Sequence, residues 1–219
     1  MPTLQQSVMK KLYAHDIWDG YTPTSAADNV QGWGGNHPSL QRLAGAPGDK
    51  VVIDVGVWKG QSTITMARAM KEAGIDGCVI AIDTFLGSPE HWEGEAFGGL
   101  FTRQTGMPDL YRTFLSNVYH AGVQDYVVPI PQTSTTAALI LQRRQLTASV
   151  IHIDAAHEYL EVLRDIEEYW KILAPGGDLI GDDYIQNWPG VVRAVGEFSA
   201  RVGQPLTIAP PKCILRKSQ

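Results

Sequence analysis

Three aspartates and one histidine in the C-terminal half have the types and spacing of a metal-assisted catalytic site. The apolar run S-V-I-H-I ends at Asp154, and His157 follows three residues later. The run D-L-I-G ends in the pair Asp182 and Asp183. Crowded carboxylates repel, so at least one is protonated unless a cation neutralises them. Hard oxygen ligands suit Mg²⁺, Ca²⁺ or Mn²⁺ rather than zinc. We therefore predict a divalent cation, Mg²⁺ foremost, held by Asp154, Asp182 and Asp183.

These residues also have structural interpretations. Consecutive strand residues point to opposite faces, so Asp182 and Asp183 share an ion only if the chain turns there. Otherwise Asp183 caps the next helix and Asp182 faces solvent. His157 is expected beside the carboxylates, where it serves as a general base or a metal ligand, unless it is a surface or capping histidine. We favour a catalytic role for His157 and Asp154, and we expect His152, inside the apolar run, to be a buried structural histidine.

A second constellation, nearer the N-terminus, is typical of a nucleotide site. In the turn D-V-G-V-W-K-G-Q-S-T, which begins at Asp54, Gly56 and Gly60 let the backbone approach a ligand. Ser62 or Thr63 can cap the helix that follows. The spacing G-x-x-x-G differs from the G-x-G-x-x-G that seats a pyrophosphate, which disfavours a dinucleotide. Asp83, which ends the next apolar run, is placed to accept both hydroxyls of a ribose. The alternative is a tight strand–helix turn with Asp83 as a cap.

Strands and helices that alternate along the chain must position these residues. The apolar patterns predict strands at 50–56, 78–83, 125–131, 149–154, 178–183, 205–209 and 213–217, and helices at 61–74, 109–122, 134–145, 156–177 and 187–203. The last two strands are expected to form a hairpin. Alternation of this kind builds right-handed crossovers and a parallel sheet covered on both faces. We predict an α/β fold whose doubly wound sheet binds ligands above the carboxyl ends of its strands.

The first 49 residues differ from the rest of the chain. We predict a helix over 1–14 and an ordered loop over 17–40, which is rich in Gly, Pro, Asn and Trp. Residues 1–49 are therefore assigned to an N-terminal cap, with the helix and a lid segment, and residues 50–219 to one ligand-binding domain.

Composition excludes several classes of protein. A net charge of −5 and a pI near 5.6 do not fit a nucleic-acid footprint or a polybasic membrane anchor. No apolar run is long enough for a bilayer, and the N-terminus lacks an apolar secretory core. Cys78 and Cys213 cannot frame a disulfide-stabilised fold and are expected to be reduced core thiols. We expect a cytoplasmic protein with a small-molecule substrate and neither nucleic acid nor membrane as a partner; a homo-oligomer stays open.

The acid-x-Gly-x-x-x-Gly turn, with an acid at the end of the second strand, resembles class I S-adenosylmethionine-dependent methyltransferases. The resemblance covers residues 50–216 and implies a Rossmann-like sheet of seven strands, mostly parallel with an antiparallel last strand. It also implies S-adenosylmethionine as the cofactor. The residues implied around its methionine moiety are Asp54, Gly56, Lys59, Gly60 and Ser62, with Asp83 at the ribose and Gln132, Thr133 and Ser134 by the adenine.

The pattern I-D-x-x-H with a later D-D resembles the metal-dependent O-methyltransferases of methyltransferase family 24. Members modify sugars, macrolides and aminocoumarins, and proteins labelled cephalosporin hydroxylase fall in the same group. The resemblance implies Mg²⁺ on Asp154, Asp182 and Asp183 and a base at His157. Catechol methyltransferases usually carry an amide where this chain has Asp183. The implied function is methyl transfer to a small-molecule hydroxyl on a sugar or natural product.

The acceptor is expected between the cap and a long loop at 84–108. Tyr21, Trp33 and His37 lie in a segment that resembles the lid of such enzymes, although core packing explains Trp33 equally well. The loop offers ring-binding surface through Trp92, Phe97, Phe101 and Met107. Two other classes compete with methyl transfer. The missing G-x-G-x-x-G counts against a nicotinamide-dependent oxidoreductase, and the acids at every strand end count against a non-catalytic Rossmann-like binding module.

Overall fold

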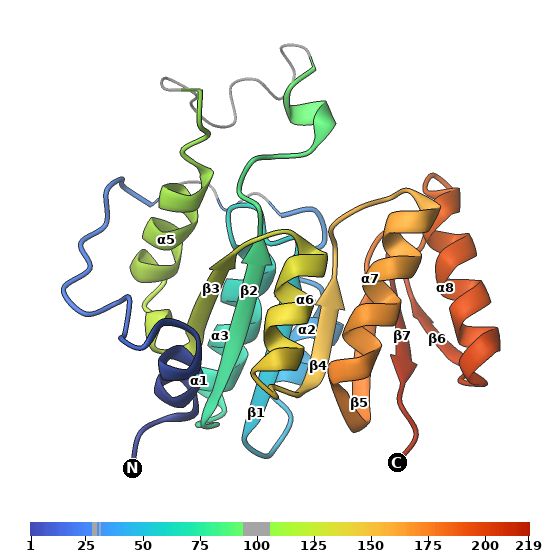
Figure 1. Ribbon diagram of the computed structural model, residues 1–219, viewed down its shortest axis with the longest axis horizontal. Coiled ribbons are helices and arrows are strands. Elements are labelled where there is room, and N and C mark those ends of the chain that lie inside the picture. Colours follow the sequence, from blue (N-terminus) through green and yellow to red (C-terminus); the bar gives the residue numbers. More distant parts are fainter. Residues whose placement is uncertain (28–29, 31, 94–105) are drawn as a thin grey trace.

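Parallel strand pairing organises the chain. The computed structural model describes residues 1–27, 30, 32–93 and 106–219, and in them seven strands form one sheet in the order β3-β2-β1-β4-β5-β7-β6 (Figure 1). The strands are β1 (Lys50–Val55), β2 (Gly77–Asp83), β3 (Val127–Pro131), β4 (Ala148–Ile153), β5 (Leu173–Gly181), β6 (Leu206–Ala209) and β7 (Lys212–Arg216). Strands β1 to β5 run parallel, and β7 is antiparallel to both β5 and β6. The predicted mostly parallel sheet with an antiparallel last strand is confirmed.

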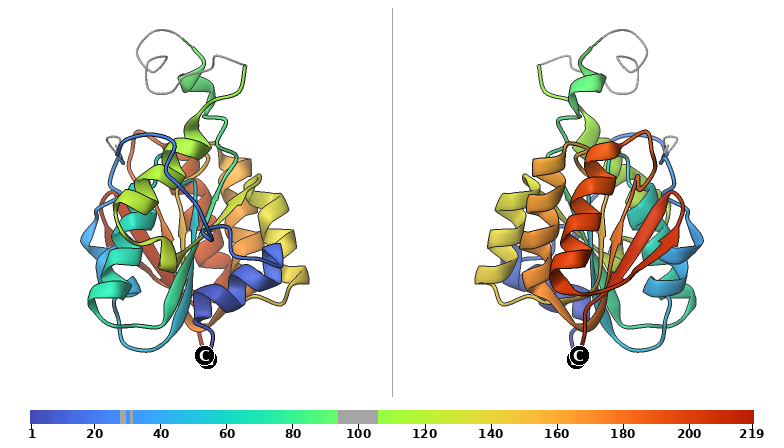
Figure 2. Two further views of the ribbon diagram at one scale, coloured as in Figure 1. Left: turned by 90° about the vertical axis from the view of Figure 1, so that its left-hand side faces the viewer. Right: turned by 90° about the vertical axis from the view of Figure 1, so that its right-hand side faces the viewer.

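Helices cover both faces of this sheet, as a doubly wound fold requires (Figure 2). One face carries α2 (Pro38–Ala44), α3 (Gln61–Glu72) and α5 (Leu110–His120), and the other carries α1 (Leu4–Tyr13), α6 (Ser134–Arg143), α7 (Tyr159–Ile172) and α8 (Pro189–Val202). Two short 3-10 helices, η1 (Pro89–His91) and η2 (Gln124–Tyr126), lie in the connections. None of the helices in the described ranges is long and apolar enough to cross a membrane.

Two helices differ from the sequence prediction. Helix α2 overlaps the end of the segment predicted as a loop; Pro38 opens it, and Leu40 and Leu43 are buried. At seven residues, α2 is too short to show a helical period, and contact with α3 supports it. Helix α7 was expected to run to the Pro-Gly-Gly stop, but it ends at Ile172 because Leu173 already pairs with Ala148 of β4.

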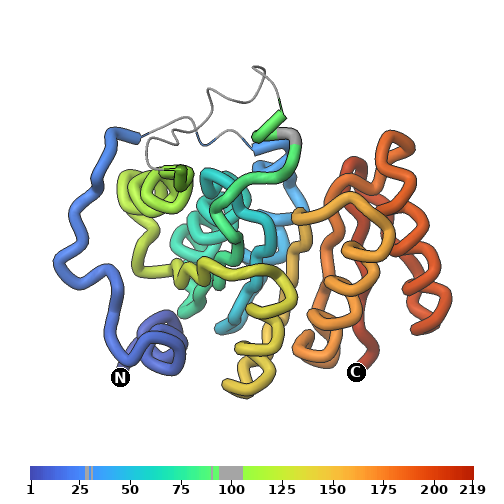
Figure 3. The backbone as a smooth tube through the Cα atoms, turned by 45° about the horizontal axis from the view of Figure 1, so that its top comes forward, coloured from blue at the N-terminus to red at the C-terminus, as the bar shows by residue number. Residues whose placement is uncertain are grey.

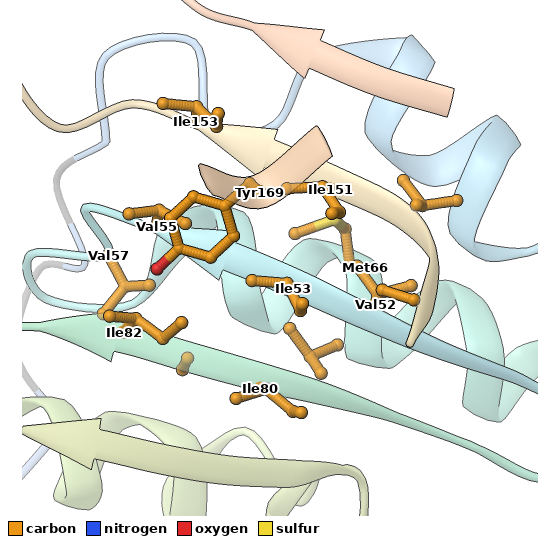
Figure 4. Packing of buried hydrophobic residues seen from close by; sticks show 14 of the residues in the cluster. Val52, Ile53, Val55, Val57, Met66, Ile80, Ile82, Ile151, Ile153 and Tyr169 are labelled. Carbon is orange, nitrogen blue, oxygen red and sulfur yellow. The ribbon is translucent and has the colours of Figure 1, made fainter. Parts of the chain in front are cut away.

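The core consists of strand residues buried from both sides, which explains the near-continuous Val and Ile runs in the sequence. Aliphatic side chains of β1, β2 and β4 gather near Tyr169 of α7 (Figure 4). The ring of Tyr169 is fully buried, and its hydroxyl donates a hydrogen bond to the Ser134 carbonyl at 2.8 Å. Cys78 and Cys213 are free and buried, and burial raises the pKa of each thiol to about 12. They are the predicted reduced core thiols.

The N-terminal segment protects the β3 edge of the sheet. Edge strands expose backbone groups that can pair with another chain, and Pro129 and Pro131 already remove two donors here. The Trp18 indole donates from Nε1 to the Val127 carbonyl at 2.9 Å, and the Tyr13 hydroxyl donates to the Pro129 carbonyl at 2.5 Å. The first 18 residues are thereby bound to the sheet, while the division of the chain at residue 49 stays a prediction.

We predict that Trp18→Phe destabilises the protein. The ring retains most of its apolar contact, but the Val127 carbonyl loses its donor, which costs about 1 kcal/mol. For a chain of this size, that loss lowers Tm by about 2–4 °C in thermal denaturation. Trp33→Phe is the matched control, because Trp33 is 59% exposed and its replacement is expected to leave Tm unchanged. Equal Tm values for Trp18→Phe and the unsubstituted protein would contradict this role of the indole.

Candidate active site

The switch point of the sheet brings the candidate residues to one edge. Strands β1 and β4 are neighbours, yet the chain leaves β1 for α3 on one face and β4 for α7 on the other. Figure 3 turns the carboxyl ends of the strands toward the reader. Ligands of open α/β sheets bind outside this edge, where the helices diverge. Asp54, Asp83, Asp154 and Asp182 all lie at or just after the carboxyl ends of their strands.

The glycines of the β1–α3 turn are required by close packing. Gly56 has φ +83°, and a Cβ atom there would lie 1.8 Å from the carbonyl oxygen of Asp154. Gly60 has φ +101°, and a Cβ atom there would lie 3.0 Å from the Phe114 ring. Only glycine allows this conformation and this approach without strain. The predicted turn is therefore present, and it is packed directly against the segment that carries Asp154.

Asp54 is turned into the protein rather than toward the open edge. It is fully buried, and its carboxylate accepts hydrogen bonds from Ser62 Oγ at 2.8 Å and from Thr63 Oγ1 at 2.6 Å. Both hydroxyls donate to Oδ2, and Oδ1 lies 2.7 Å from Nδ1 of His152. Asp54 and Ser62 thus fasten the first turn of α3 to β1. Lys59 is also buried, and its carbonyl accepts a bond from Asn117 Nδ2 at 3.0 Å. Contact of Asp54, Lys59 and Ser62 with a ligand stays a prediction.

Asp83 joins two loops at the end of β2. Its Oδ2 accepts the Trp58 N–H at 2.9 Å, and its Oδ1 accepts the Phe85 N–H at 2.7 Å. Burial raises the pKa of this carboxyl, while the backbone donors partly offset that effect. The Gln132 N–H donates to the Asp83 carbonyl at 3.0 Å, so the predicted ribose and adenine residues are neighbours. In that adenine turn, Thr133 caps α6 and Ser134 Oγ donates to Asp165 at 2.6 Å.

The acidic residues form two overlapping groups that share Asp154. In the inner group the ligand atoms of His152, Asp154 and Asp182 lie within 4.8 Å of one another; in the outer group, those of Asp154, His157 and Asp183 do. Asp183 has φ +54°, and its N–H donates to Asp182 Oδ1 at 2.8 Å. The chain therefore turns between the two aspartates, as a shared site requires. Within the described ranges, however, the turn sends their carboxylates into different groups.

A buried cation that sequence analysis missed, Lys212, contacts the inner group. Lys212, the first residue of β7, is fully buried and forms an ion pair with Asp182. Its Nζ lies 3.1 Å from Nε2 of His152, whose Nδ1 faces Asp54. A lysine directly before the apolar run C-I-L was the only signal in the sequence, and it did not reveal a buried contact. The expectation of a buried structural His152 is confirmed.

The surrounding groups shift the pKa values of Asp154 and Asp182 in opposite directions. Burial and the charges of Asp182 and Asp183 raise the pKa of Asp154 well above its ordinary value. For Asp182, burial acts in the same direction, but His152 and Lys212 outweigh it and lower its pKa. Burial and Lys212 lower the pKa of His152, but Asp182 and Asp54 outweigh them and raise it to about 9. Asp182 is therefore the anionic partner of Lys212, and Asp154 retains a proton most readily.

The outer group faces the accessible side. His157 Nε2 lies 2.9 Å from Asp183 Oδ2, and about a quarter of each side chain is exposed. The imidazole stacks on the Trp188 indole, with ring centroids 3.9 Å apart and an interplanar angle of 18°. Gly190 lets α8 approach this turn, because a Cβ atom there would lie 2.4 Å from the His157 carbonyl oxygen. Trp188 is a second site residue that sequence analysis did not single out.

A glycine-rich stretch of the N-terminal segment, residues 32–35, lies between the β1–α3 turn and Asp182. The Gly32 N–H donates to Gln61 Oε1 at 2.8 Å, and a Cβ atom on Gly35 would lie 2.9 Å from the Ser62 nitrogen. A Cβ atom on Gly34 would lie 3.7 Å from both Asp182 Oδ2 and Lys212 Nζ. Trp33, between these glycines, is largely exposed. Core packing of Trp33 is therefore excluded, while the lid role of this segment stays a prediction.

The other predicted acceptor residues are placed differently. His37 caps α2 and accepts the Ser39 N–H, whereas Tyr21 lies against α5 with its hydroxyl 3.4 Å from Ser116 Oγ. Trp92 and Met107 are exposed. Phe97 and Phe101 lie outside the described residues. A stacked pair of Trp58 and His91, with centroids 4.2 Å apart, joins the β1–α3 turn to the long loop and was not predicted.

Comparison with known proteins agrees with this architecture. The O-methyltransferase NovP is 22% identical, with 83% of this chain and 78% of its own covered and a TM-score of 0.61. CalS11, a TDP-rhamnose 3′-O-methyltransferase of calicheamicin biosynthesis, is 18% identical, with 81% and 76% covered and a TM-score of 0.56. An O-methyltransferase from Bacillus cereus, in complex with SAH, is 16% identical, with 100% and 98% covered and a TM-score of 0.57. Structural matches at identities this low show a shared fold and no more than that.

The sequence match is more specific. Residues 53–184, more than half of the chain, match the methyltransferase domain of family 24. The matched range begins in β1, before the glycine turn, and ends after Asp183, so it contains both candidate constellations. The protein therefore belongs to methyltransferase family 24 and is an S-adenosylmethionine-dependent methyltransferase.

Proposed function

We propose that this enzyme transfers the methyl group of S-adenosylmethionine to a hydroxyl of a small molecule, a sugar or another natural product, with the help of a divalent cation. One observation carries the proposal. The glycine turn of the family's cofactor motif abuts the acidic cluster, with Gly56 packed against the Asp154 carbonyl. A methyl donor above β1 and a hydroxyl beside β4 and β5 would therefore be close enough for direct transfer.

On the cofactor side, the proposed ligands of S-adenosylmethionine are the β1–α3 turn, Asp83 and the turn at residues 132–134. The two backbone donors to Asp83 support its role, because they fix the carboxylate at the end of β2 before a ribose binds. The bond from the Gln132 N–H to the Asp83 carbonyl supports a continuous adenosine site over β2 and β3.

The outer group fits a divalent cation better than the inner one. Mg²⁺ keeps several waters and binds through one or two carboxylates together with substrate, and Asp154 and Asp183 offer two carboxylates on the accessible side. Asp182, the predicted third ligand, is paired with Lys212. Such an ion, when bound, lowers the pKa of a coordinated hydroxyl.

His157 is the proposed general base. Trp188 restrains one face of its ring, and Nε2–H donates to Asp183 Oδ2, so Nδ1 is the nitrogen that accepts the hydroxyl proton and Asp183 stabilises the resulting imidazolium. The acceptor oxygen forms a bond to the methyl carbon as the carbon–sulfur bond breaks, which yields the ether and S-adenosylhomocysteine. Asp154 is the alternative base, because its carboxylate lies in the same group as His157 and Asp183.

The acceptor is proposed to be a ring-bearing molecule. Trp33 and Trp92 are exposed indoles on the cap and the long loop, and such surfaces bind sugars and aromatic rings. The sugar acceptor of CalS11 supports this choice. Membership of family 24 and the acids at the strand ends favour methyl transfer over an oxidoreductase or a non-catalytic binding module.

We predict that Asp154→Asn abolishes methyl transfer but leaves cofactor binding intact. Asparagine preserves the shape of the side chain, and the variant loses a carboxylate that would hold both cation and proton, so turnover falls at least about 100-fold. A methyl-transfer assay measures the loss, and calorimetry with S-adenosylhomocysteine checks that the cofactor site is unchanged. Full turnover in the variant, or undiminished turnover of the unsubstituted enzyme in a chelator, would exclude the metal-assisted mechanism.

We predict that Asp83→Ala weakens S-adenosylmethionine binding at least about tenfold, a loss of about 1.4 kcal/mol. The variant lacks the acceptor for the ribose hydroxyls and the link between the Trp58 and Phe85 amides. Calorimetry gives the dissociation constant. Asp125→Ala is the matched control, because this aspartate lies on the surface in η2. Equal affinity in the two variants would remove Asp83 from the cofactor site.

A further inference from the structure

Lys212 is a buried charge that methyl transfer as proposed above does not use. Its side chain has 0% exposure, and its ammonium contacts Asp182 from β5 and His152 from β4. Removing an ammonium group from water costs several kcal/mol unless a well-placed anion compensates. In the described part of the chain, the anion that forms an ion pair with Lys212 is Asp182. The pair is therefore a specific feature of this site.

The contacts of Asp182 leave little of its carboxylate for an external ion. Oδ1 accepts the Asp183 N–H at 2.8 Å. Oδ2 contacts the Lys212 ammonium and lies 3.6 Å from His152 Nε2. A divalent cation bound to either oxygen would lie close to an ammonium in a region of low dielectric, where like charges repel strongly. Asp154 and Asp183 have no such cation as a direct partner among the described ion pairs.

We propose that Lys212 is a built-in counter-cation that reserves Asp182 as a positioning residue, so that the divalent cation is held by Asp154 and Asp183 without Asp182. This inference rests on the proposed metal-assisted function and specifies its ligand set. Lys212 neutralises Asp182, and Asp182 in turn binds the backbone N–H of Asp183 at the left-handed turn that directs the Asp183 carboxylate outward.

The test measures Mn²⁺ affinity by calorimetry on the protein without cofactor, so it does not depend on activity. Asp183→Asn is expected to weaken Mn²⁺ binding at least about tenfold, because a carboxylate ligand is lost. Lys212→Met/Asp182→Asn, which removes the ion pair as a unit and keeps an oxygen for the Asp183 N–H, is expected to change it less than about threefold. If Lys212→Met/Asp182→Asn weakens binding as much as Asp183→Asn, Asp182 is a ligand; the inference is then overturned, and the metal-assisted function stands.

Lys212→Met is expected to change Mn²⁺ affinity in the opposite direction, toward tighter binding. The variant frees Asp182 and lacks the repelling charge, while the local bond from the Asp183 N–H remains, so Mn²⁺ binding is expected to tighten about tenfold. That gain is expected to disappear in Lys212→Met/Asp182→Asn, because the double variant lacks the freed carboxylate. The double variant also leaves no unpaired buried charge, so it can still be measured if Lys212→Met unfolds. The matched control is Lys171→Met, an exposed lysine of α7 paired with Glu168, which is expected to change nothing.

Unchanged or weaker Mn²⁺ binding in folded Lys212→Met would overturn the inference. Absence of binding in every variant and in the unsubstituted protein would overturn both the inference and the metal-assisted function. Binding by Lys212→Met alone would also overturn both, because the unsubstituted protein would then hold no cation on Asp154 and Asp183.

Discussion

The buried network Asp54–His152–Lys212–Asp182 connects the two halves of the candidate active site. Its members lie in β1, β4 and β7 and directly after β5, so they meet only when these four strands have paired. Buried charges stabilise a structure only when each has a partner, and here a chain of contacts supplies them. At one end Asp54 binds the first turn of α3, and at the other Asp182 sets the turn at Asp183. The β1–α3 turn and the acids thus share one support.

Close backbone packing adds a second constraint to this support. Gly56 meets the Asp154 carbonyl, Gly190 meets the His157 carbonyl, and Gly35 meets the Ser62 nitrogen. Each approach requires the absence of a side chain, because a Cβ atom would overlap its neighbour. In the proposed reaction, methyl donor and acceptor must be held within reach without a flexible gap between their sites. The glycines provide that proximity, and the charged network provides rigidity beneath it.

The N-terminal segment links fold and function in the same way. Trp18 and Tyr13 bind the carbonyls of the β3 edge, and further along, the Gly32–Gly35 stretch reaches Gln61 and the vicinity of Asp182. A segment held at one end by the sheet can thus lie beside the β1–α3 turn without forming a core of its own. This arrangement explains why the described residues at the two ends of this segment, 1–27 and 32–49, contact the sheet and its helices although their sequence lacks the regular alternation of the rest of the chain.

Residue order alone determined the alternation of strands and helices, and therefore the edge at which the acids gather, because carboxyl ends of parallel strands meet on one side. Periodicity could not reveal Lys212, since one lysine before an apolar run has the same local pattern whether it is exposed or buried. It also could not separate Asp182 from Asp183, because their division depends on a left-handed turn and on a partner 30 residues away. Sequence by itself thus determined which residues share the site. Only tertiary structure decided which of them are already neutralised, because electrostatic partners are chosen by distance in space.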